Sequence, residues 1–174
     1  MKSDLVKKLL RALVTALGIG LGSVLAFVIV QLNAMAGNPA MSIGALLALY
    51  AAFALLLAVL EKRANQKTYN QDVYINVAGG LELSEPAADL ALCMAVVSSL
   101  KDAAIGAEVA VMGEVGLAGE VRAIPQCDRR ISECQRLGFT TILLPKENMR
   151  RLKAPEGMKL VGVDTVMQAI SVLF

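Results

Sequence analysis

The apolar residues of this chain are concentrated in its first third. From Ala12 to Leu60 the sequence contains no Lys, Arg, Asp or Glu. A hydrocarbon core about 30 Å thick is crossed by roughly 20 apolar residues in a helix, and Asn38-Pro39 marks a turn inside the run. The pattern predicts a transmembrane helical hairpin within residues 1–62, with spans near 10–32 and 42–60.

Basic residues flank this run, and the segment between the two spans carries no charge. They are Lys2, Lys7, Lys8 and Arg11 before the first span and Lys62, Arg63 and Lys67 after the second. The positive-inside rule then places both termini in the cytoplasm, with the lipid bilayer as a partner. A cleaved signal peptide is the alternative, because Ala34-Met35-Ala36 has the cleavage form. The length of the apolar run favours the uncleaved hairpin.

Short alternating strands and helices follow a polar linker at residues 63–71. Strands are expected over 72–77, 109–112, 120–124, 140–144 and 159–161, and helices over 86–100, 128–137, 146–152 and 165–173. The first helix is almost entirely apolar but too short to span a membrane, so it should be the buried central helix, with Pro86 in its first turn and Ser84 as a possible N-cap. The order of elements predicts an α/β (α+β) domain over residues 72–174.

Composition excludes several kinds of chemistry. The chain has no histidine, which removes Ser-His-Asp and Cys-His catalysis and every zinc site that uses histidine. The three cysteines, Cys93, Cys127 and Cys134, match no zinc spacing and are expected to be free thiols. No GxxxxGK[ST] loop occurs, so no nucleotide is expected to bind, and we predict neither cofactor nor metal. A formal net charge of +2 does not indicate nucleic-acid binding.

One segment carries a specific resemblance. Gly113–Arg122 reads GEVGLAGEVR, and it is accompanied in order by Asn76–Gly80, Arg130–Glu133 and Ala154–Met158. Together they resemble the C-terminal Lon-protease-like domain of the bacterial DNA-repair RadA (Sms) family, over about residues 70–174. The resemblance implies the ribosomal S5 domain 2-like fold of the Lon proteolytic domain and homo-oligomeric rings, commonly hexamers. The zinc motif and ATP-binding loop of that family do not occur in this sequence.

The resemblance also indicates where peptidase chemistry would reside. Lon-type proteases use a serine nucleophile activated by a lysine, and the corresponding positions here are Ala87 and Asp128. A methyl group cannot attack a carbonyl, and a carboxylate cannot replace an ammonium group. The sequence therefore predicts that the dyad is vestigial and that the protein is not an enzyme.

Other polar groups have ordinary explanations beside functional ones. Ser98 and Lys101 have an S-x-x-K spacing, for which a polar helix end is the better explanation. Asp89 and Glu114 could form a carboxylate pair, although structural acids are the preferred interpretation. A basic cluster could contact anionic lipid or nucleic acid, or be a solvated face. Its members are Arg129, Arg130 and Arg136 on one predicted helix and Lys146, Arg150, Arg151 and Lys153 on or near the next.

We therefore expect a membrane-anchored, catalytically degenerate Lon/RadA-like domain that acts as an oligomerisation scaffold or binds a protein partner that the sequence does not identify. A membrane-associated DNA-binding or DNA-repair accessory is the first alternative. A residual Lon-type (S16) serine peptidase that uses another nucleophile is the second.

Overall fold

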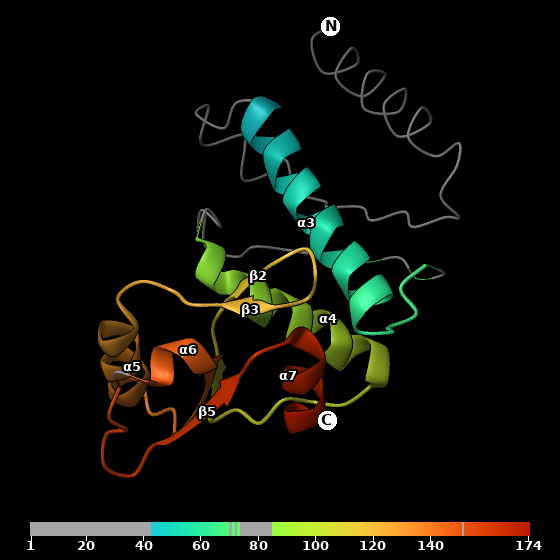
Figure 1. The fold of residues 1–174 in the computed structure, drawn as a ribbon. Helices are drawn as coiled ribbons and strands as arrows, with labels where there is room; N and C mark the ends of the chain where they lie inside the picture. The colour runs from blue at the N-terminus through green and yellow to red at the C-terminus, as the bar shows by residue number, and fades with distance from the viewer. Residues whose placement is uncertain (1–42, 70, 72, 74–84, 151) are drawn as a thin grey trace, which may run out of the picture.

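The computed structural model describes residues 43–69, 71, 73, 85–150 and 152–174 (Figure 1). Side chains of the first helix are described from Ala51 onward. The predicted first span at 10–32 and the possible cap Ser84 lie outside the described residues, as does almost all of the predicted strand at 72–77.

A parallel sheet of three strands forms the centre of the domain. Its order is β1 (Val109–Val111), β4 (Thr141–Pro145) and β5 (Lys159–Val163). The middle strand is the most buried because helices cover its faces and strands cover both of its edges, and Ile142, Leu143 and Leu144 are fully enclosed. Parallel neighbours need crossover connections, which contain α5 (Cys127–Arg136) and α6 (Lys146–Met149). This arrangement confirms the predicted mixed α/β fold.

The glycine-rich segment that carries the resemblance forms a hairpin. β2 (Glu114–Val115) pairs antiparallel with β3 (Val121–Arg122), and Glu114 lies opposite Arg122. The sequence predicted a strand only over 120–124 and a turn before it. β2 was not predicted, because it contains only two residues and lies within the glycine-rich segment that was interpreted as a turn.

The predicted central helix is confirmed. A short 3-10 turn, η2 (Pro86–Ala88), leads into α4 (Asp89–Lys101), which buries Leu90, Met94 and Val97 almost completely. The last helix, α7 (Val166–Leu173), begins at Thr165, whose hydroxyl oxygen accepts the backbone N–H of Gln168 at 3.1 Å. Such a cap satisfies one of the free donors at a helix start.

The stretch predicted as the second membrane span coincides with α3 (Ile43–Arg63). In the part of α3 whose side chains are described, Phe53, Leu57 and Leu60 are buried in the same core as residues of α4 and α7. Figure 1 shows α3 above both helices. One face of this part of the helix is therefore covered by the protein's own core, whereas Leu55 on the other face is 51% exposed. Among the residues that the structure describes, no helix is both long enough and apolar enough to cross a membrane.

The predicted linker is partly an ordered cap on α3. Asn65 takes a left-handed backbone conformation (φ 52°), and the N–H of Gln66 donates to the carbonyl of Leu60 at 3.0 Å. Thr68 is fully buried, and its hydroxyl donates to Glu61 Oε2 at 3.2 Å. These bonds satisfy polar groups that a helix end leaves without partners.

Candidate functional site

Ala87, the position that corresponds to the Lon-type nucleophile, is closed into the core. It lies in η2 with 5% of its surface exposed, in an apolar cluster that includes Met112, Ile124 and Cys127. Its carbonyl oxygen accepts the N–H of Gly113 at 2.8 Å. The methyl group is thus packed among apolar side chains, and the carbonyl of Ala87 is bonded to Gly113, just before the β2–β3 hairpin.

Asp128, the position that corresponds to the lysine, lies in the first turn of α5 and is exposed. The residue before it, Cys127, belongs to the same apolar cluster as Ala87. The fold therefore brings the two predicted dyad positions, Ala87 and Asp128, into one region. Within the described residues, no serine or threonine hydroxyl is hydrogen-bonded to a lysine.

The S-x-x-K spacing of Ser98 and Lys101 marks the end of α4. Ser98 Oγ donates to the carbonyl of Ala103 at 2.6 Å, and Asp102 follows in the left-handed conformation with φ 49°. The hydroxyl thus closes the helix end. This geometry agrees with a structural role for the pair and does not resemble an activated nucleophile.

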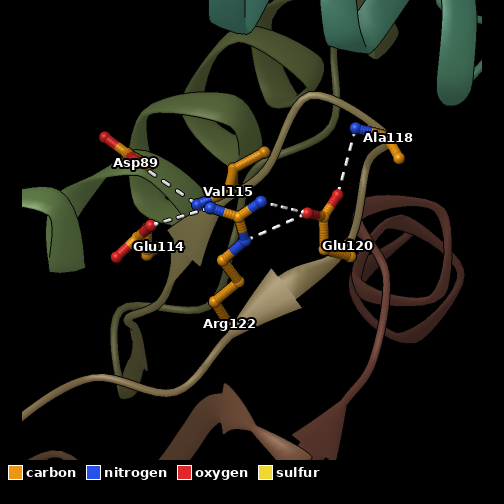
Figure 2. Close-up of polar contacts among 6 residues, drawn as sticks. All are labelled: Asp89, Glu114, Val115, Ala118, Glu120 and Arg122. Carbon is orange, nitrogen blue, oxygen red and sulfur yellow. Dashed lines mark hydrogen bonds and ion pairs between the residues drawn. The ribbon is translucent and has the colours of Figure 1, made fainter.

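A polar network crosses the hairpin and reaches the start of α4 (Figure 2). The guanidinium of Arg122 lies between two carboxylates: Nη1 is 3.3 Å from Glu114 Oε1, and Nε donates to Glu120 Oε1 at 3.0 Å. Glu120 Oε2 accepts the N–H of Ala118 at 3.0 Å. Asp89 joins from α4, where its Oδ2 accepts the N–H of Val115 at 3.3 Å.

Asp89 and Glu120 have pKa values shifted in opposite directions. Burial raises the pKa of Asp89, and the nearby Glu114 carboxylate raises it further, while the N–H of Val115 acts against both. Glu120 is exposed, and hydrogen bonds from its own backbone N–H and from Arg122 lower its pKa. Asp89 and Glu120 each accept hydrogen bonds from groups of the hairpin: Asp89 from the N–H of Val115, and Glu120 from the N–H of Ala118 and from Arg122. Among the described residues, no group of three or more potential ligands is arranged to hold a metal ion.

Two glycines of the hairpin allow close packing. A Cβ on Gly113 would lie 2.9 Å from Val121 Cγ1, and one on Gly119 would lie 2.9 Å from Arg63 Cβ on α3. Gly119 also has φ 84°, which residues with a side chain rarely adopt. Several residues of the GEVGLAGEVR segment therefore have structural roles in close packing and hydrogen bonding.

The predicted basic cluster is partly neutralised within the domain. Arg130 pairs with Glu85 at 3.0 Å, Arg136 pairs with Glu133, and Lys146 pairs with Asp164 at 2.8 Å. Arg129, Arg150 and Lys153 are exposed, whereas Arg151 lies outside the described residues. Contact of these residues with lipid or nucleic acid stays a prediction.

The three thiols are free, as predicted. Burial raises the pKa of Cys93 to about 12. The pKa values of Cys127 and Cys134 are also raised, first by burial and then by neighbouring carboxylates. A thiolate nucleophile at neutral pH is therefore disfavoured at all three positions.

A groove that the sequence analysis missed lies between β3, α6 and β5. Its volume is about 810 Å³, and its lining residues are Val121, Lys146, Glu147, Met149, Arg150, Gly162 and Asp164. Beside it, the side-chain amide of Asn148 binds both backbone groups of Ile124, at 3.0 Å and 2.9 Å. No periodic pattern marks such a site, because residues from three separate elements create it.

Comparisons with known proteins give a consistent result. The family model for the Lon protease (S16) C-terminal proteolytic domain matches residues 30–173. The chain is 46% identical over 119 residues to DNA repair protein RadA of Escherichia coli K12, and 48% identical over 121 residues to that of Aquifex aeolicus. The protein of the same name from Streptococcus pyogenes serotype M1 is 42% identical over 120 residues.

These matches cover 68–70% of this chain but only 26–27% of each relative. The chain therefore spans about a quarter of the length of the curated proteins that it matches. The family match begins at residue 30, ahead of the predicted domain start at residue 72 and inside the stretch predicted as a membrane hairpin.

Proposed function

The chain belongs to the Lon protease (S16) C-terminal proteolytic domain family, and we propose that it acts there as a non-catalytic assembly and partner-binding module. The proposal rests on the identity and burial of Ala87. Its methyl group lies in an apolar cluster at the start of the central helix, with 5% of its surface exposed.

Lon-type hydrolysis needs a hydroxyl that attacks and an amine that takes its proton. Ala87 and Asp128 offer a methyl group and a carboxylate in their place. Loss of a nucleophile alone typically lowers kcat by about 10⁶. The neighbouring backbone bonds to Gly113 in both directions, since Ala87 O accepts from the N–H of Gly113 and Gly113 O accepts from the N–H of Leu90 at 3.0 Å.

A serine-reactive phosphonate tests this proposal on the full chain. We expect no covalent adduct by intact-mass measurement after prolonged incubation. Ser98→Ala is the matched variant, because Ser98 is the serine with the S-x-x-K spacing. An adduct on the wild-type protein that this or another serine substitution removes would contradict the non-catalytic assignment.

Self-association is part of the same proposal. A module without its own chemistry acts by holding chains together, and the family resemblance implies rings. We expect light scattering after size exclusion to give a mass that is a multiple of 18.4 kDa at micromolar protein. A monomer across that concentration range would remove assembly from the proposal.

A DNA-repair accessory role is the second candidate, supported by the identity of 42–48% to proteins named DNA repair protein RadA. Exposed Arg129, Arg150 and Lys153 are the residues that would contact phosphate. Affinity for duplex and single-stranded DNA should then fall steeply with salt, because bound cations are released from phosphate. Absence of binding, or binding that salt does not change, would eliminate this candidate.

Attachment to a bacterial inner membrane, with both termini cytoplasmic, is a separate proposal. The charge-free run from Ala12 to Leu60 and its basic flanks support it, whereas the packing of α3 from Phe53 onward argues against the second span. Alkaline carbonate extraction of membranes that contain the full chain provides the test. Retention in the pellet agrees with an integral hairpin, and release into the supernatant contradicts it.

A further inference from the structure

β5 leaves half of its backbone groups directed away from the sheet. It is an edge strand in the order β1-β4-β5, and the N–H of Lys159 donates to Thr140 O at 2.8 Å. Because partners alternate along a strand, Lys159, Val161 and Val163 face β4. The N–H and C=O groups of Leu160 and Gly162 therefore point to the outer edge.

The far end of this edge is already used as a strand-pairing surface. The N–H of Val121 donates to Asp164 O at 2.8 Å, and Glu120 forms an antiparallel bridge with Thr165. After Val121 the chain leaves β5, because the amide of Asn148 holds both backbone groups of Ile124. Among the described residues, no strand pairs with β5 between Leu160 and Gly162.

The groove described above reaches this unpaired edge at Gly162, and Asp164, just after β5, also lines it. Its volume of about 810 Å³ falls within the range of ligand-binding clefts. One face of the edge is closed by α6: a Cβ on Gly162 would lie 3.0 Å from Lys146 Cα and would overlap the sulfur of Met149. A ligand must therefore approach edge-on, as an added strand does.

The charges of the groove select against a polyanion. Its lining contains two basic residues, Lys146 and Arg150, and two acidic ones, Glu147 and Asp164. Lys146 and Asp164 already pair with each other. A nucleic-acid backbone would meet both carboxylates, whereas a peptide backbone offers the donors and acceptors that the strand edge needs without a charge penalty.

We propose that the outer edge of β5, between Leu160 and Gly162, binds an extended and nearly neutral segment of a partner protein as an added β-strand. The inference deepens the proposed function, on which it rests, by giving the module a defined partner site. The segment is expected to contain β-branched residues, which favour the extended conformation. Its backbone pairs with Leu160 and Gly162, and its side chains contact Val121 and Met149.

Amide hydrogen exchange of the ¹⁵N-labelled full chain tests the free edge first. The amides of Leu160 and Gly162 should exchange at least about tenfold faster than those of Val161 and Val163, which are bonded within the sheet. Equal protection of all four amides would mean that the edge is already covered and would overturn the proposal. This comparison needs no substitution and does not depend on whether a variant folds.

Binding is then measured with the neutral peptide acetyl-Thr-Val-Thr-Val-Thr-amide at millimolar concentration. We expect saturable shifts and slower exchange, by a factor of about three or more, at Leu160 and Gly162. The matched peptide with proline at its centre lacks the required N–H and should give no protection. Leu160→Pro removes an outward N–H while leaving the bonds to β4, and it should abolish the effect.

Three results would overturn the proposal. They are no saturable effect of the threonine–valine peptide, equal protection by the proline peptide, and protection of these amides by a short DNA duplex in place of the peptide. None of them bears on phosphonate labelling, so failure of the peptide site and failure of the non-catalytic assignment are distinguishable.

Discussion

The start of α4 and the outer edge of β5 are opposite kinds of surface on one small domain. At the start of α4, Ala87 is enclosed by apolar side chains and its carbonyl is bound by Gly113. At β5, Leu160 and Gly162 direct their backbone groups to the outer edge of the sheet, and Gly162 lines a groove. In the first region, the polar backbone groups of Ala87 and Gly113 bond to each other and the side chain is enclosed. The second has unused bonding capacity, which points to recognition.

The largest expected effect concerns the closed region. Leu90 follows Asp89 in the first turn of α4 and is fully buried against the hairpin. Leu90→Ala should lower the free energy of unfolding by about 2–5 kcal/mol, because it leaves a cavity in a packed core. Leu117→Ala is the matched control. Leu117 is 66% exposed at the hairpin tip, so its change should stay within about 0.5 kcal/mol in urea unfolding.

The next largest effect is expected at Asn148, which binds the chain after β3 through both backbone groups of Ile124. Asn148→Ala removes both bonds to Ile124 and leaves partly buried backbone groups without partners. We expect a loss of about 1–3 kcal/mol in chemical denaturation, with faster exchange of the Ile124 amide. Glu147→Ala, its exposed neighbour on α6, should be close to neutral. Equal losses for both variants would contradict the bracing role of Asn148.

A smaller effect is expected at Arg122, which joins the two strands of the hairpin through Glu114 and Glu120. Both acids and the guanidinium are exposed to water, so the ion pairs contribute little and are screened by salt. Arg122→Gln should lower the melting temperature slightly at low ionic strength, and the difference should vanish near about 1 M salt. A large loss that salt does not change would contradict this description.

The smallest effect is a change in pH dependence at Asp89. Its pKa is raised above the ordinary 3.8 in the folded state, so the folded protein binds this proton more tightly than the unfolded chain. The resulting stabilisation is complete below the ordinary pKa and is lost as pH rises through the raised one. Asp89→Asn keeps an oxygen to accept from Val115. Its stability relative to wild type should therefore increase from acidic to neutral pH in parallel urea titrations, and a constant difference would be contrary to the expectation.

The same two regions show how far the sequence could predict the structure. The central helix was predictable because its apolar residues and Pro86 are local signals, and the buried strand β4 was predictable from its short apolar run. The packing of α3 was not, since a fully apolar helix has the same pattern in lipid and in a protein core. Residues distant in sequence create the groove at β5, where Asn148 meets Ile124, and no local pattern encodes that contact.

Hydrolysis of casein by the purified full chain is the most direct test of the central claim. Because the resemblance assigns the dyad positions to Ala87 and Asp128, we expect no cleavage above that of buffer, at any protein concentration at which the chain is folded. Cleavage that persists through repeated purification, and that is lost on substitution of one of the chain's own serines, would contradict it.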